Sequence, residues 1–171
     1  RPGSEPVPEA EEIARTVPVI AALRGEWDGL ISIDTSKTAV AEAALIAGAD
    51  IVNDVSGLMA DPAMAGVCAS HGCGVVVMHM QGNPRSMQIA PHYSDVVAEV
   101  GGFFRDRFRT LVAAGMDPEV LCFDPGIGFG KTFRHNIELL NQIALFHGLG
   151  VAVLVGLSRK GFVGALTGEK V

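Results

Sequence analysis

The sequence alternates between short apolar runs and longer stretches with helical periodicity, and this alternation constrains the fold more than any other feature. Each run is rich in β-branched or aliphatic residues and is followed directly by a polar residue or a glycine. Continuous apolar strands that alternate with helices are typical of a parallel sheet covered by helices. We therefore predict an α/β protein with strands near 30–34, 51–54, 75–78, 120–124 and 151–155.

The stretches between these runs carry helix start and stop signals. Side-chain caps are expected at Ser36, Asp61 and Ser94, because serine and aspartate accept hydrogen bonds from the free amides of a first helical turn. Pro18 is expected to interrupt the first helix, since proline has no amide hydrogen to donate. The predicted helices span 8–24, 36–47, 61–72, 94–115 and 135–146, and a last helix is expected to open at 158–160.

Polar residues near the ends of the predicted strands distinguish two architectures. In a (β/α)8 barrel the functional groups come from the carboxyl ends of many strands, whereas an open doubly wound sheet gathers them near one switch point. Because five strands cannot close an eight-stranded barrel, we predict one domain over residues 1–171, a partial (β/α)8 TIM barrel with about five of the eight strands and both ends truncated. The polar strand ends that favour the barrel are Asp34, Asn53-Asp54, His79, Asp124 and Ser158.

Composition excludes several classes of protein. Apolar residues make up 49% of the chain and the net charge is −6 with scattered cations, which argues against disorder and against a nucleic-acid surface. The apolar run 151–157 is too short to cross a bilayer. Three cysteines are too few for a disulfide framework, so a reducing cytoplasm is expected. Cys68 and Cys73 bracket His71, but zinc sites use tighter pairs, so packing cysteines are the favoured interpretation.

A glycine-rich stretch, Phe-Asp-Pro-Gly-Ile-Gly-Phe-Gly-Lys-Thr at 123–132, follows one of the apolar runs. It is not a nucleotide phosphate loop, because Pro125 stands where that motif requires a glycine. It also lacks the dinucleotide spacing, since Lys131 occupies the third glycine position. The stretch places Asp124 at the carboxyl end of a strand, directly before a tight turn. Asp124 therefore belongs either to a functional site or to an ordinary connection in which it caps the turn.

Three strand-end residues form a group that suits a flat heterocycle. A carboxylate accepts two parallel hydrogen bonds from an N–H pair and an asparagine both donates and accepts, so Asp34, Asn53 and Asp124 together suit an amino-pyrimidinone edge. Each residue taken singly also fits a turn or cap. Ser158-Arg159-Lys160 at an expected helix start is consistent with an anion site, or with an ordinary helix cap followed by solvated charges.

Five ordered motifs resemble those of the dihydropteroate synthase family, the folate-pathway enzymes that sulfonamides inhibit. They are Ser-Ile-Asp-Thr at 32–35, Val-Asn-Asp-Val at 52–55, Met-His-Met-Gln-Gly-Asn-Pro at 78–84, Asp-Pro-Gly-Ile-Gly-Phe-Gly-Lys at 124–131 and Gly-Leu-Ser-Arg-Lys at 156–160. The resemblance implies a (β/α)8 barrel and a transferase. Its members join 6-hydroxymethyl-7,8-dihydropterin diphosphate to p-aminobenzoate, releasing diphosphate and yielding 7,8-dihydropteroate.

The resemblance also implies roles for individual residues. Asp34, Asp124 and Lys160 would be catalytic. The pterin would be bound by Asp34, Asn53, Met78, Asp124, Phe129, Gly156 and Lys160, and p-aminobenzoate by Arg1, Pro2, Ser158 and Lys160. The family uses Mg2+, whose ligand is expected from a first strand outside this segment, and its members form homodimers. No metal ligand is expected within the segment.

Two other functions remain open on the sequence. The pterin-binding barrel of methyltetrahydrofolate:corrinoid methyltransferases uses similar aspartate and asparagine positions, although 79–84 and Ser158-Arg159-Lys160 favour the synthase. A non-catalytic paralogue could keep the pterin pocket and lack the diphosphate site. The segment by itself is expected to turn over little substrate, because the resemblance places an asparagine and an Arg-x-His pair on strands that these residues do not include.

Overall fold

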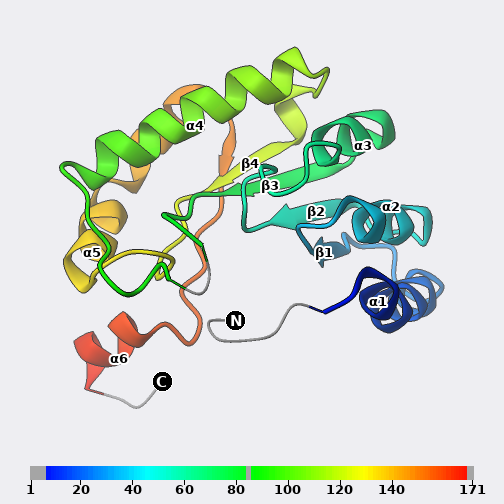
Figure 1. Ribbon diagram of the computed structural model, residues 1–171, viewed down its shortest axis with the longest axis horizontal. Coiled ribbons are helices and arrows are strands. Elements are labelled where there is room, and N and C mark those ends of the chain that lie inside the picture. Colours follow the sequence, from blue (N-terminus) through cyan, green and yellow to red (C-terminus); the bar gives the residue numbers. More distant parts are fainter. Residues whose placement is uncertain (1–6, 84–85, 169–171) are drawn as a thin grey trace.

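The computed structural model describes residues 7–83 and 86–168, which form one five-stranded sheet flanked by helices (Figure 1). The strands are β1 (Ser32–Asp34), β2 (Ile51–Asp54), β3 (Gly74–Met78), β4 (Leu121–Asp124) and β5 (Ala152–Val153). All neighbours are parallel and their order in the sheet is the order in the chain. A doubly wound sheet reverses its strand order at a switch point. The described strands show no reversal, which confirms the partial barrel.

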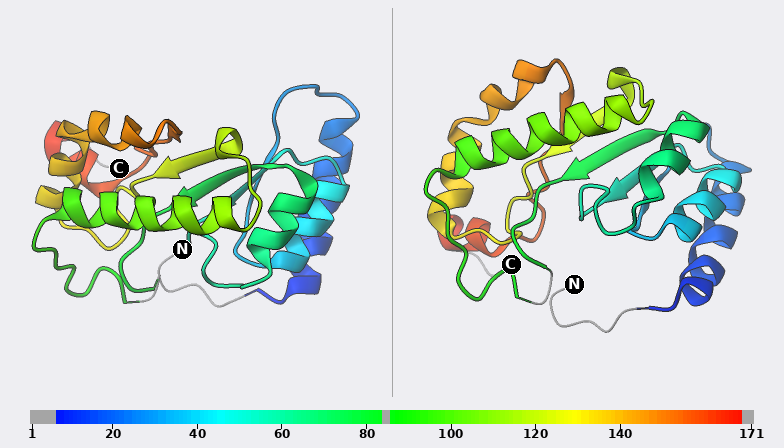
Figure 2. Two further views of the ribbon diagram at one scale, coloured as in Figure 1. Left: turned by 90° about the horizontal axis from the view of Figure 1, so that it is seen from above. Right: turned by 45° about the horizontal axis from the view of Figure 1, so that its top comes forward.

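The helices lie in an arc around one side of this sheet (Figure 2). They are α1 (Glu9–Arg24), α2 (Thr38–Ile46), α3 (Met64–His71), α4 (Val96–Ala113), α5 (Phe133–Asn141) and α6 (Gly161–Thr167), with short 3-10 helices η1 (Pro118–Val120) and η2 (Ile143–Leu149). Each of the first four strands is followed by a helix, as the apolar pattern predicts. None of the described helices is both long and apolar enough to cross a membrane.

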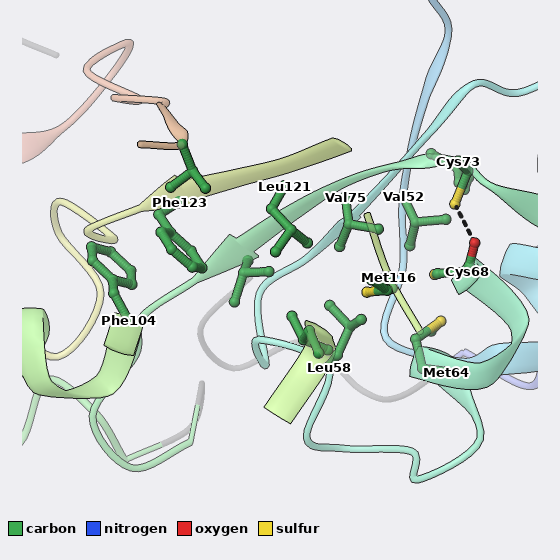
Figure 3. Packing of buried hydrophobic residues seen from close by; sticks show 14 of the residues in the cluster. Val52, Leu58, Met64, Cys68, Cys73, Val75, Phe104, Met116, Leu121 and Phe123 are labelled. Atoms are coloured by element: carbon green, nitrogen blue, oxygen red, sulfur yellow. Dashed lines mark hydrogen bonds between the residues drawn. The ribbon is translucent and has the colours of Figure 1, made fainter. Parts of the chain in front are cut away.

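The core lies between the helices and one face of the sheet. Alternate strand residues point to this face, and Val52, Val75, Leu121 and Phe123 form a continuous apolar row there (Figure 3). Phe104 of α4 stacks on Phe123 with ring centroids 4.6 Å apart. The opposite face of the sheet is therefore the one left for a site.

Pro18 does not interrupt the first helix, contrary to the expectation. The α1 helix runs through it from Glu9 to Arg24. Pro18 and Ala14, whose carbonyl would pair with an amide at position 18, are both exposed, so the carbonyl that loses its partner is open to solvent. The apolar side of α1, with Ile20 buried, packs against α2 without a break.

The predicted caps are partly wrong. The cap of α4 is Asp95 rather than Ser94, and its carboxylate accepts a hydrogen bond from the Ala98 amide at 2.9 Å. The α2 helix begins after Lys37 rather than Ser36, and the Asp61 carboxylate accepts from the Thr38 amide at 3.2 Å. Asp61 thus stabilises α2 from a distant part of the chain, which a local cap rule does not anticipate.

The cysteines are packing residues, as expected. Cys68 and Cys73 are buried in the core, and the Cys73 thiol donates to the Cys68 carbonyl with a sulfur to oxygen distance of 3.7 Å (Figure 3). The pKa of the Cys68 thiol is raised, mainly by its hydrogen bond with Cys73 and secondly by burial. His71, between them in the sequence, is exposed, so the three residues do not converge.

Candidate active site

The pairing of β1 with β2 places two predicted site residues side by side. Asp34 and Asn53 are register partners in the parallel ladder, and partners across a ladder project to the same face. The adjacent Ile33 and Val52 are buried on the opposite, helix-covered face. Asp34 and Asn53 therefore lie together on the free face of the sheet, at the carboxyl ends of their strands.

Asp124 projects from the same face further along the sheet. Asn53 is the partner of Val76, Val76 is the partner of Cys122, and Asp124 follows Cys122 by two residues. A two-residue step in a strand returns to the same face. The structure thus brings Asp34, Asn53 and Asp124 to one face and one edge, as the barrel prediction requires.

The carboxyl groups of this edge have unusual environments. Burial raises the pKa of Asp124, while a hydrogen bond from the Gly126 amide at 2.7 Å and the charges of Lys160 and Lys131 oppose that rise. Burial also raises the pKa of Asp34, and the negative charges of Asp54 and Glu12 add to the effect. Both groups are poised to be stabilised by donors or by positive charge on a ligand.

Asp54, which follows Asn53, has a structural role instead. It faces the helices, is fully buried, and accepts hydrogen bonds from the Ser56 amide at 2.8 Å, the Ser56 hydroxyl at 2.9 Å and the Leu58 amide at 3.1 Å. These bonds fix the turn between β2 and α3. Of the neighbouring polar residues at this strand end, only Asn53 is available to the free face.

The glycine loop after β4 is shaped by close contact with the chain after β3. Gly126, Gly128 and Gly130 all have positive φ angles, of 67°, 81° and 62°. A Cβ atom on Gly126 would collide with the carbonyl oxygen of His79, and one on Gly130 would lie 2.8 Å from the carbonyl oxygen of Gln81. Glycine is therefore required both for the backbone conformation and for the contact.

Lys160 and Phe129 meet at this loop from distant parts of the chain. The Lys160 ammonium lies 4.2 Å from the centroid of the Phe129 ring, within the range of a cation–π contact. Burial lowers the pKa of Lys160 and the nearby Asp124 raises it. Met78 is the register partner of Asp124 and is buried beside it. Four of the predicted residues are thus gathered around one end of β4.

Two buried titratable residues at this end of the sheet, Lys131 and His79, are not among those to which the resemblance assigns a substrate. Lys131 ends the glycine loop with 3% of its surface exposed, and its ammonium lies 3.1 Å from His79 Nδ1. Burial and the Lys131 charge lower the pKa of His79 to about 3, and burial lowers the pKa of Lys131 to about 7. A lysine beside a glycine loop is ordinarily expected to be solvated. The burial of Lys131 is evident only from its position between the ends of β3 and β4.

Comparison with known proteins identifies the family. The family model described as pterin binding enzyme matches residues 1–171. The chain belongs to the pterin-binding enzyme family. It is 46% identical over 166 residues to the dihydropteroate synthase of Synechocystis sp., covering 97% of this chain and 57% of that protein.

Solved structures of dihydropteroate synthases match this pterin-binding family member closely. That of Yersinia pestis, in a sulfonamide drug complex, superposes with a TM-score of 0.95 at 41% identity, covering 99% of this chain and 62% of that chain. That of Xanthomonas albilineans in complex with 7,8-dihydropteroate gives a TM-score of 0.89 at 43% identity, covering 99% and 61%. The chain thus spans about three fifths of its relatives' length, and these relatives favour the synthase over the methyltransferase alternative.

The remaining predicted residues of this family member lie beyond β5 or outside the described part. Gly156 is half-buried in the segment that follows β5, and Ser158 is exposed in the turn before α6. The expectation that Ser158 opens the last helix is wrong, because α6 begins at Gly161 and Arg159 has a φ angle of 57° that breaks helical continuity. The helix-start argument for an anion site therefore fails. Arg1 and Pro2 lie outside the described residues.

The described residues of this family member do not fit a metal centre. Within 7–83 and 86–168, no group of three or more histidine, cysteine, aspartate or glutamate side chains is arranged to hold a metal ion. Asp34 and Asp124 come from strands that are separated by β2 and β3.

Proposed function

We propose that this chain forms the central part of a dihydropteroate synthase, which condenses 6-hydroxymethyl-7,8-dihydropterin diphosphate with p-aminobenzoate. One observation carries the proposal: Asp34, Asn53 and Asp124 leave the same face of the sheet at its carboxyl end. The family assignment and the relative solved with 7,8-dihydropteroate support the same function. The whole protein is expected to be a transferase of folate biosynthesis.

The pterin is proposed to bind by its amino-pyrimidinone edge. Carboxylates at Asp34 and Asp124 accept hydrogen bonds from the ring N–H and amino groups, and the Asn53 amide both donates and accepts. The adjacent Met78, Phe129 and Gly156 supply surface against the ring faces. Burial of Asp124 strengthens each bond that it makes, because few water molecules compete for the same oxygen atoms.

The second substrate is proposed to approach from the side of Lys160. The Lys160 ammonium lies over Phe129 and near Asp124, so it can reach both the pterin and p-aminobenzoate. The exposed Ser158 hydroxyl is proposed to bind the aminobenzoate carboxylate, together with Arg1 and Pro2. Lysine and hydroxyl donors provide charge-assisted hydrogen bonds to such an anion.

The proposed reaction needs no side-chain nucleophile. The bond between the pterin methylene carbon and diphosphate oxygen breaks, the electron pair leaves with diphosphate, and the aromatic amine forms the new carbon–nitrogen bond and loses a proton. Asp34 and Asp124 stabilise positive charge that develops on the ring system during this step, because fixed negative groups in a partly buried site act strongly. Lys160 holds the attacking ring in place.

Several properties of the complete protein are part of this proposal. The Mg2+ that the resemblance implies is proposed to be held by residues outside this segment, on the first strand of the family's barrel. The complete protein is proposed to act in the cytoplasm as a homodimer, with the pterin diphosphate and p-aminobenzoate as its small-molecule partners.

A chimera tests the proposal directly. In this chimera the segment replaces the matching residues of the Xanthomonas albilineans synthase, whose fold it shares. We expect dihydropteroate formation by the chimera and its loss, by 100-fold or more, on Asp124→Ala, since on the order of 3 kcal/mol is lost with a buried charged hydrogen-bonding group. The matched control is Asp106→Ala on α4, an aspartate with 80% of its side chain exposed. Equal turnover in the two variants would refute the site.

A further inference from the structure

Lys131 is buried, and the atoms around its ammonium group offer one hydrogen-bond acceptor for each of its protons. Its Nζ atom lies 2.9 Å from the Phe129 carbonyl oxygen, 3.3 Å from the His79 carbonyl oxygen and 3.1 Å from His79 Nδ1. An ammonium group has three protons to donate and accepts none. Three acceptors for three donors form a complete set of hydrogen bonds around a charge that has left water.

These three hydrogen bonds join two segments that the proposed site requires. His79 directly follows β3, and Phe129 lies in the glycine loop that follows β4. The Phe129 ring contacts Lys160, and the same loop provides the Gly126 amide that binds Asp124. Because Lys131 joins His79 to Phe129, it also determines the positions of the Phe129 ring and of the Asp124 carboxylate.

We propose that Lys131 is a positioning residue for pterin binding, which clamps the glycine loop to the end of β3 and so presents Phe129 and Asp124 to the ligand. This inference rests on the proposed function. It deepens that function by assigning a role to a residue whose ammonium group is hydrogen-bonded to the chain itself.

The clamp requires a particular form of His79. For Nδ1 to accept from the ammonium, the imidazole must be neutral with its proton on Nε2. The pKa of His79, lowered to about 3 by burial and by the Lys131 charge, keeps the ring neutral at physiological pH. The ring is also held in place by an edge-to-face contact with Phe103, with centroids 5.0 Å apart.

The clamp is expected to weaken as pH rises through neutrality. Above its pKa of about 7 the neutral Lys131 amine donates two protons and can accept one, so its bond with His79 persists only if the imidazole proton moves from Nε2 to Nδ1, and the bonds to the two carbonyl oxygens lose their charge assistance. The titratable groups that face it are His79 after β3, Asp124 at the end of β4, Lys160 before α6, Tyr93 before α4 and His135 on α5. Of these, Asp124 raises the pKa of Lys131 and Lys160 lowers it.

The clamp itself can be tested on the chain without any substrate. We expect the NMR shifts of the His79 imidazole and of the Phe129 carbonyl carbon to move together with pH, with one midpoint near the lysine pKa of about 7. The same shifts should lack that midpoint in Lys131→Met. Independent titrations of the two groups in the wild-type chain would overturn the inference, whether or not the variant folds and whatever the chimera does.

The role in binding is tested in the chimera by steady-state kinetics between pH 6 and 9. We expect Lys131→Met to raise KM for the pterin diphosphate about tenfold, with a smaller change in kcat and in KM for p-aminobenzoate. The wild-type pterin KM should rise with pH and that of the variant should not. Tyr93→Phe is the matched control, because it removes one hydrogen bond to the same loop, from the tyrosine hydroxyl to the Gly130 carbonyl, without removing a charge.

The outcomes separate this inference from the proposed function. If Tyr93→Phe raised the pterin KM and changed its pH dependence as much as Lys131→Met does, any loosening of the loop would have this effect. That result would overturn the specific role of Lys131. An equal pterin KM in wild type and Lys131→Met would overturn it as well. An inactive wild-type chimera would instead contradict the proposed function, and the NMR titration would then decide for or against the clamp.

Discussion

Asp34 and Asn53 are direct partners across the β1–β2 ladder, with their side chains on the face of the sheet opposite the helices. Adjacent strands lie about 4.8 Å apart, so the two groups can engage neighbouring atoms of one planar ligand. Asp124 of β4 lies two strands from Asn53 and three strands from Asp34, so the backbones are roughly 10 Å and 14 Å apart across the same face. A gap of this width, reduced by the side chains that extend into it, suits a bicyclic ring rather than a single small ion.

Replacement of Asn53 by alanine should weaken the pterin specifically. Asn53→Ala removes both a donor and an acceptor, and we expect the pterin KM of the chimera to rise about 10-fold to 30-fold, since each lost hydrogen bond costs about 1 kcal/mol. The KM for p-aminobenzoate should change little. The control is Asn141→Ala at the exposed end of α5, and a comparable effect there would contradict the assignment.

Gly126→Ala should destabilise the fold more than other glycine replacements. The new Cβ would collide with the His79 carbonyl and would also stand on a residue with positive φ, so we expect a loss of about 3 kcal/mol in the free energy of unfolding. Urea denaturation measures this loss.

Two other glycines separate the collision from the backbone strain. Gly72 has a φ angle of 60° but open space around its Cβ position, so Gly72→Ala should cost only about 1 kcal/mol. Gly66 lies inside α3 with open space and no positive φ, and Gly66→Ala should stabilise the chain by about 0.5 kcal/mol. Equal costs at Gly126 and Gly72 would show that the contact with His79 is unimportant.

The sequence predicts the sheet and the inner-face residues because parallel pairing follows simple rules. Apolar runs locate the strands, and polar residues at their carboxyl ends must then meet at one edge. Asp34, Asn53 and Asp124 are accordingly placed as predicted. The exact helix starts are less predictable, because Ser94 and Asp95 are both good caps and the choice between them depends on the backbone path of the preceding loop.

Other features depend on contacts between distant residues and have no local signal. Lys131 is buried because His79, 52 positions earlier, provides two of its acceptors. The Asp61 carboxylate accepts a hydrogen bond from the first amide of α2, 23 positions earlier in the chain. The start of α6 depends on Arg159, whose positive φ is rare for a residue with a side chain and is not indicated by its identity. These are the parts of the fold and of the site for which a structure is necessary.

Phe104→Ala should unfold the chain at markedly lower urea concentration. Phe104 is buried, stacks on Phe123 and meets Phe146 edge to face at 5.3 Å, so its removal leaves a cavity under α4. We expect a loss of about 3–5 kcal/mol in the free energy of unfolding. The control Phe133→Ala, at a residue that is 47% exposed, should cost far less. Similar losses for both would contradict the core described above.

His79 should make stability depend on pH below neutrality. Its pKa is lowered from 6.5 to about 3, so between these values the unfolded chain binds more protons than the folded chain. The free energy of unfolding then rises with pH across this window; the contribution is complete above pH 6.5 and is lost as pH falls towards 3. The upper limit is about 5 kcal/mol, because each pKa unit corresponds to about 1.4 kcal/mol.

A difference measurement isolates this contribution. Asp34 and Asp124 have raised pKa values, so their contributions fall as pH rises above 3.8 and oppose that of His79 in the wild-type curve. His79→Gln keeps an acceptor for Lys131 and does not titrate, so the wild-type minus variant stability should rise between pH 3 and 6.5 in urea denaturation. A flat difference for His79→Gln would mean that the imidazole takes up its proton as readily in the folded chain as in the unfolded chain, which contradicts the buried, neutral acceptor that the Lys131 ammonium requires.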